Sequence, residues 1–158
     1  MPQPKFKGNV SSAGDFELDA LTGEAIYQRV AAVQNIRTRF TIAQVNAGAT
    51  LLSAVPGFKY RMVGCRAIAV GGAAGAVTTI DVLATQSASS VKLVAYAQAS
   101  ATQSTLLRDG ASGGTILADG ASYVANDANT AITVGKTGSS ITTATHIDIS
   151  FDYVVEPA

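Results

Sequence analysis

The chain has 158 residues, the usual size of one domain with its own hydrophobic core. Hydrophobic residues make up 47% of it and charged residues 14%, the reverse of the composition that keeps chains disordered. Eleven basic and eleven acidic side chains give a formal net charge of zero. Nucleic-acid-binding domains usually carry a marked basic excess, so the charge argues against that class of protein. We therefore expect one folded domain that does not take nucleic acid as a partner.

The charges are unevenly distributed along the chain. Residues 1–66 hold eight basic and four acidic residues, whereas residues 67–158 hold three basic and seven acidic residues. No acid occurs in residues 25–80, so this stretch could form a basic face that meets an acidic face on a second copy or on another protein. Its basic side chains are Arg29, Arg37, Arg39, Lys59, Arg61 and Arg66. The alternative is that both signs mix on the folded surface.

The cysteine content and the apolar runs restrict the environment of the protein. The single cysteine, Cys65, lies in an apolar run, which excludes a disulfide framework and predicts a buried thiol. No segment has the roughly 20 uninterrupted apolar residues of a membrane-spanning helix. The first eight residues have no apolar run behind their lysines, so we do not expect a secretory signal. We expect synthesis in a reducing cytosol and no membrane as a partner.

In chain order, the first predicted element is an extended arm. Residues 1–24 are rich in Pro, Gly, Ser and Asp with only scattered apolar anchors, a pattern typical of an arm rather than a packed element. Ile26, Val30 and Val33 then fall at helical spacing, which predicts a short helix with Thr22 as its N-cap. The spacing of Ile26 and Val30 also fits a strand.

From residue 38 onward, short apolar segments recur between Gly, Asn, Asp and Ser, which is typical of β-strands. The last strand is the clearest, because Ile147, Ile149 and Phe151 alternate with polar residues and give one apolar face. Further strands are expected at residues 38–45, 60–70, 78–84, 91–98, 115–117, 122–124, 131–134 and 141–143. We therefore predict an all-β, jelly-roll-like antiparallel β-sandwich over residues 38–158, preceded by an extended N-terminal arm with a short helix over residues 1–37.

Turn residues separate these predicted strands. Pro56-Gly57 occupies the two central positions of a tight turn that Pro and Gly favour. Asp109-Gly110 and Asp119-Gly120 suit tight reversals with positive φ. The second of these pairs repeats the first after ten residues, so the segment between them is expected to be one short strand.

Three patterns invite a chemical interpretation, and each fits a structural role better. The Gly-Lys-Thr triplet at 135–137 lacks the glycine that a phosphate-binding P-loop needs at position 130, so we expect a loop between strands. His146, Asp148 and Asp152 share one face of the last strand, but a flat strand face does not wrap zinc or calcium. The single His and the lack of a Gly-x-Ser-x-Gly motif argue against a catalytic triad. We expect no enzymatic activity, no metal and no cofactor.

Several short strings carry a family resemblance. They are TIAQVNAG at 41–48, LL and VPGFKY within 51–60, LADGA at 117–121, and NDANTAI and TATHID within 126–148. These strings resemble small virion proteins of tailed bacteriophages, most closely the capsid decoration proteins, also called cement or head-stabilising proteins. The resemblance covers about residues 38–155. It implies a β-sandwich that is made in the host cytoplasm and sits as a homotrimer on the capsid exterior, with the major capsid protein as its partner.

The expected surface agrees with a binding role. Strands rich in Ala, Thr, Ser and Val but poor in charge leave broad faces that favour association with protein. We therefore expect a structural virion protein that stabilises the shell. Its predicted capsid-docking residues are Lys5, Phe6, Lys7, Arg29, Arg37 and Arg39. The alternative is a β-sandwich receptor-binding module or tail or fibre head module of a phage particle.

Overall fold

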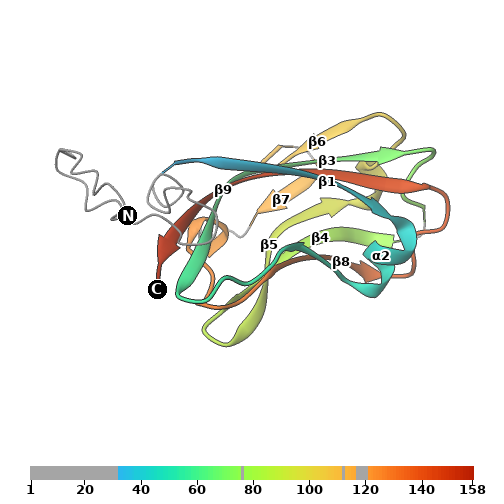
Figure 1. Ribbon diagram of the computed structural model, residues 1–158. Coiled ribbons are helices and arrows are strands. Elements are labelled where there is room, and N and C mark those ends of the chain that lie inside the picture. Colours follow the sequence, from blue (N-terminus) through green and yellow to red (C-terminus); the bar gives the residue numbers. More distant parts are fainter. Residues whose placement is uncertain (1–31, 76, 112, 117–120) are drawn as a thin grey trace, which may run out of the picture.

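The computed structural model describes residues 32–75, 77–111, 113–116 and 121–158. Within these ranges, two antiparallel β-sheets pack face to face around one hydrophobic core (Figure 1). The predicted all-β sandwich is therefore confirmed. Most of the predicted arm, including most of its proposed short helix, lies outside the described residues.

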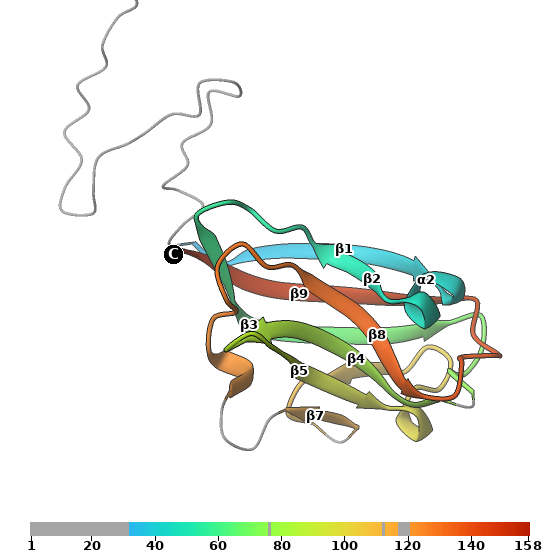
Figure 2. The same cartoon turned by 90° about the horizontal axis from the view of Figure 1, so that it is seen from below.

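Four strands form the first sheet and five form the second. The first sheet has the order β1-β9-β3-β6, where the strands are Gln34–Thr41, His146–Pro157, Phe58–Val70 and Leu106–Arg108. The second sheet has the order β2-β8-β4-β5-β7, where the strands are Ala49–Leu52, Ile132–Gly138, Val77–Gln86, Ser89–Ala97 and Gly114–Ile116. Figure 2 shows β1 and β2 along the same border of the sandwich.

The strand pairs are nested in the manner of a jelly roll. β1 pairs with β9, β2 with β8, β3 with β6 and β4 with β5, and successive pairs alternate between the two sheets. This is the arrangement of one long antiparallel ribbon wound around a core. The pairings of β3 with β9 and of β4 with β8 complete the two sheets, and β7 adds a further strand beside β5.

The core lies between the sheets and is filled by alternate residues of the long strands. Ile149 and Phe151 of β9 are fully buried, as are Val82 of β4 and Tyr96 of β5. The alternation predicted for the last strand is therefore confirmed. Cys65 is also fully buried, as expected, and this burial raises the pKa of its thiol to about 12. The thiol is therefore a small core residue at neutral pH.

A β-bulge in β3 decides which of its side chains face outward. Met62 pairs with Tyr153 and Gly64 pairs with Asp152, so Val63 is an extra residue without a partner. An extra residue shifts the alternation of a strand by one position. Inward residues are therefore Tyr60 and Met62 before the bulge and Cys65 and Ala67 after it. The bulge places Arg66 and Ile68 on the outer face of the sheet.

Three of the predicted strands are wrong in whole or in part. The strand predicted at 38–45 begins at Gln34 and stops at Thr41, so the sandwich starts inside the predicted arm. Helix α2, Ile42–Ala47, follows because Thr41 and Gln44 form a capping box: the Thr41 N–H donates to Gln44 Oε1 at 2.8 Å, and the Gln44 N–H donates to Thr41 Oγ1 at 3.3 Å.

The other two errors concern segments without a strand partner. Residues 122–124 overlap a 3₁₀ helix, Ala121–Tyr123, in which Ser122 donates a hydrogen bond to the Leu93 carbonyl at 2.6 Å. Residues 141–143 form a loop, because Ile141 pairs its backbone N–H and C=O with the Asn46 side chain instead of a neighbouring strand. Side-chain hydrogen bonds replace the ladder in both places.

The predicted turns can be compared with the structure at two of three positions. Gly57 has a φ of +78°, and the Phe58 N–H donates to the Val55 carbonyl at 3.2 Å, which confirms the tight turn there. Gly110 has a φ of +72°, as expected. Asp119-Gly120 lies outside the described residues. No helix within the described ranges has the length and the apolar character needed to cross a bilayer.

Candidate functional site

The outer face of the first sheet carries a row of arginines. Strand register aligns Arg37 of β1 with Ser150 of β9, Ser150 with Arg66 of β3, and Arg66 with Arg108 of β6. Neighbouring strands lie about 4.8 Å apart, so the Arg37 and Arg66 backbones are separated by about 10 Å. All three arginines are exposed. We call Arg37, Arg66 and Arg108 the arginine row.

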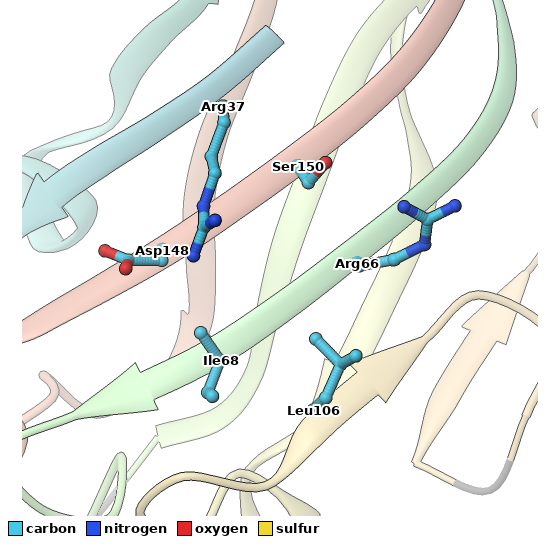
Figure 3. A pocket seen from close by; sticks show the side chains of 6 residues that line it. All are labelled: Arg37, Arg66, Ile68, Leu106, Asp148 and Ser150. Atoms are coloured by element: carbon cyan, nitrogen blue, oxygen red, sulfur yellow. The ribbon is translucent and has the colours of Figure 1, made fainter. Parts of the chain in front are cut away.

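A shallow hollow lies beside the arginine row. It has a volume of about 240 Å³ and is lined by Arg37, Arg66, Ile68, Leu106, Asp148 and Ser150. Figure 3 shows the Arg37 side chain extending from β1 toward β9, and Ile68 and Leu106 on the two strands beyond. Leu106 is 48% exposed, and Ile68 beside it is partly exposed. The hollow therefore offers guanidinium groups next to a small apolar surface.

Carboxylates of β9 neutralise some of the neighbouring cations. Arg39 Nε donates to Asp148 Oδ1 at 2.7 Å, and Arg39 Nη2 donates to Asp148 Oδ2 at 2.8 Å. These hydrogen bonds, and then the charge of Arg39, lower the pKa of Asp148, although partial burial opposes the shift. Arg66 lies 3.2 Å from Asp152, and Arg61 lies 2.6 Å from Glu156.

Three other cations on this face form no ion pair with a described residue. In the part of the chain that the structure describes, Arg37, Arg108 and Lys59 have no acidic side chain within ion-pair distance. Arg66 and Arg108 also stand directly opposite each other, and like charges in this position repel. Six cations share the face with four acids, Asp109, Asp148, Asp152 and Glu156, so it keeps a positive excess that an anionic partner would relieve.

The structure brings together part of the predicted docking set. Arg37 and Arg39 lie on this face with Lys59, Arg61 and Arg66, so most basic side chains of the acid-free stretch lie on one surface. Acids of β9 lie on the same surface. Lys5, Phe6, Lys7 and Arg29 lie outside the described residues. The docking role of all these side chains remains a prediction. Sequence reasoning missed Arg108 and Leu106, because β6 has only three residues and shows no measurable alternation.

The patterns considered for chemistry have structural explanations. His146, Asp148 and Asp152 share the outer face of β9, but Arg39 binds Asp148, while Asn35 Nδ2 donates to Asp152 Oδ1 at 2.6 Å. Within the described residues, no three His, Cys, Asp or Glu side chains gather closely enough to hold a metal ion. The Gly-Lys-Thr triplet at 135–137 lies within β8, so the prediction of a loop there was wrong. Its residues continue the ladder with β4.

A second polar cluster lies on the outer face of the second sheet. Asp81 is 1% exposed, and its Oδ2 lies 3.0 Å from Lys92 Nζ and accepts a hydrogen bond from Thr137 Oγ1 at 2.6 Å. Lys92 Nζ also donates to Thr137 Oγ1 at 2.5 Å. These three residues come from β4, β5 and β8. The cluster therefore joins three adjacent strands.

The strand order places the protein in the jelly-roll class of β-sandwiches, an architecture shared by viral capsid proteins, lectins and cupins. A fold of this kind hosts many unrelated functions. Comparisons with protein-family models, with curated proteins and with solved structures found no match. The function is therefore inferred from the surface described above.

Proposed function

We propose that this protein is a structural virion protein that binds the outside of a phage capsid as a homotrimer and stabilises the shell. The observation that carries the proposal is the arginine row on an exposed face of a jelly roll. The short strings that resemble capsid decoration proteins add support. On this proposal the partners are the major capsid protein and further copies of the chain, and the protein acts by binding without a cofactor.

The chemistry of the face suits an acidic protein surface. Guanidinium groups bind carboxylates in a planar, paired geometry, and they are more weakly hydrated than ammonium groups. Ile68 and Leu106 lie next to Arg66 and offer a small apolar contact beside the charges. In a homotrimer, three such faces would act at high effective concentration, so modest contacts on each would give lasting attachment.

The experiment measures the mass of the purified protein by light scattering and then counts the copies that bind to capsids stripped of it. We expect a trimer and a copy number that matches the capsid lattice. Arg37→Glu combined with Arg66→Glu should lower occupancy at low salt by about tenfold, because both changes reverse charge within the arginine row. Lys136→Glu, on the other sheet, is the matched control for a charge reversal. Unchanged occupancy in the double variant would contradict docking through this row.

The hollow beside the arginine row also supports a second candidate, a receptor-binding module or tail or fibre head module. A depression of about 240 Å³ with Asp148, Ser150 and Arg37 at its border could hold a polar group of a host surface. The two candidates differ in location and number. A receptor-binding module would attach to host cells and occur in few copies per particle, whereas a decoration protein would occupy the lattice.

A further inference from the structure

The first strand, β1, forms an open border of the first sheet. It pairs with β9 along its whole length, Gln34–Thr41, and within the described residues no strand pairs with its other edge. Figure 2 shows it at the border of the sandwich, beside β2 and α2. An edge of eight residues presents a row of backbone donors and acceptors to any extended segment that can pair with it. The two faces of β1 determine which segment would fit.

These two faces differ in chemistry. Asn35, Arg37 and Arg39 point to the outer face, and Arg37 forms no ion pair among the described residues. Ile36 points to the inner face, where it packs against the core and stays partly exposed. Phe40, further along the same face, is buried. A strand that fits this edge therefore needs acids on its outer side and apolar residues on its inner side.

The N-terminal sequence contains one segment with this alternation. Residues 15–19 read Asp-Phe-Glu-Leu-Asp, so acids occupy positions 15, 17 and 19 and apolar residues occupy positions 16 and 18. In an extended conformation, the three carboxylates would project to one side and the two apolar side chains to the other. Fourteen residues, 20–33, connect this segment to β1, and fourteen residues can span up to about 45 Å. The connection can therefore span more than the roughly 27 Å length of an eight-residue strand, so it is long enough for the segment to fold back beside β1.

We propose that residues 15–19 bind as an additional antiparallel strand to the free edge of β1 in the same chain. Glu17 then stands opposite Arg37 on the outer face, and Leu18 stands opposite Ile36 on the inner face. The covalent connection favours the chain's own segment over a second copy, because it holds the segment at a high effective concentration. The added strand protects the edge from uncontrolled pairing and leaves Arg66 and Arg108 accessible. This inference concerns the free protein. Because Asp15, Glu17 and Asp19 would neutralise the cations around Arg37, the added strand and an acidic capsid surface would compete for Arg37.

Disulfide trapping in the full-length chain tests the pairing. Leu18→Cys combined with Ile36→Cys should form a disulfide within one chain under mild oxidation, because directly opposite residues have Cβ atoms about 5 Å apart. Peptide mass mapping and a non-reducing gel identify the bond. Leu18→Cys combined with Val55→Cys is the control, since Val55 is exposed in the turn before β3. The buried Cys65 is not expected to compete. A disulfide between two chains, or equal yields in both variants, would overturn the proposal.

A second measurement keeps the test independent of engineered cysteines. Neutralising the segment with Asp15→Asn, Glu17→Gln and Asp19→Asn should accelerate hydrogen exchange of amides in β1 at least tenfold, because the added strand would be held less tightly. Arg37→Glu should do the same, and Glu17→Arg in that variant should restore protection by exchanging the two charges. Unchanged exchange in all variants would refute the added strand, whereas the capsid-binding proposal would be unaffected.

Discussion

Asp148 shows how a single residue remains charged although little of it is accessible to water. Its side chain is 8% exposed on the outer face of the sheet, and burial alone would raise its pKa. The two hydrogen bonds from Arg39 outweigh this effect, so its pKa lies below the ordinary value of 3.8. Arg37 also lowers this pKa from the neighbouring position on β1. The charge of this carboxylate is therefore linked to folding.

Replacing Asp148 by Asn should make stability less dependent on pH in the acidic range. The unfolded chain takes up a proton at this group before the folded protein does, so the stabilisation is complete above the ordinary pKa of 3.8 and is lost as the pH falls through the lower folded-state pKa. Urea unfolding at neutral pH should show a lower midpoint for Asp148→Asn than for the unaltered protein. The difference in urea midpoint between this variant and the unaltered protein should narrow in acid. Arg39→Met should show the same trend. A difference that is constant with pH would contradict this explanation.

At the level of elements, one loop holds the start of β3, the turn before β3 and the β4–β5 hairpin in place. Asn126 Oδ1 accepts a hydrogen bond from the Tyr60 N–H at 2.5 Å, and Asn129 Oδ1 accepts one from the Gly57 N–H at 2.7 Å. The Asp127 carboxylate accepts the N–H groups of Ser87 and Ala88, at 3.0 and 2.7 Å, in the β4–β5 hairpin. Residues 126–130, part of the strings behind the family resemblance, therefore have a structural role that any family with this loop would share.

The β4–β5 turn should gain stability from residues that tolerate positive φ. Ser87 and Ala88 have φ values of +51° and +58°, a two-residue turn of the type that favours Asn-Gly. Ser87→Asn with Ala88→Gly should raise the free energy of unfolding by about 1 kcal/mol, because the left-handed conformation costs other residues about this much. Urea denaturation measures the change. Ser90→Gly in β5 is the control and should lower stability by about 0.5–1 kcal/mol. A loss of stability in the turn variant would contradict the argument.

At the level of the whole molecule, β9 is the strand that connects β1 to the rest of the first sheet. It lies between β1 and β3 and pairs with β3 from the Phe58–Pro157 pair to the Val70–His146 pair. Without it, β1 would lose its only described strand partner, and the buried residues Ile149 and Phe151 would leave the core. By contrast, the strand pairs that the structure describes all lie within residues 34–157.

Two truncations should therefore behave differently. Removal of residues 1–31 should preserve the β-type circular dichroism spectrum and a cooperative thermal transition, because the described strand pairs remain. Removal of residues 146–158 should abolish the cooperative transition, because it removes β9 and opens the core. Scanning calorimetry with circular dichroism measures both. Loss of cooperative unfolding in the first truncation would show that the jelly roll is not self-contained.

The sequence predicted the long strands well and the short elements poorly. β3, β4, β5 and β9 have enough residues for alternation to be visible, and each overlaps its predicted range. β2 and β6 have four and three residues, too few to show a period, and they form because neighbouring strands offer them partners. Helix α2 was missed because its start depends on the capping box at Thr41, which interrupts an apolar run that also fits a strand.

The sequence by itself determined an all-β chain with a buried thiol, an apolar and a polar face on the last strand, and an acid-free stretch rich in arginine. Only the tertiary structure decided that this stretch meets three acids of β9, so that Arg39, Arg61 and Arg66 are paired while Arg37 is not, and that Arg108 of β6 joins the same face. The physical reason is register. Alternation assigns a side chain to a face, but its neighbours across the sheet depend on pairings between residues 76 to 119 positions apart, and on the extra residue in β3.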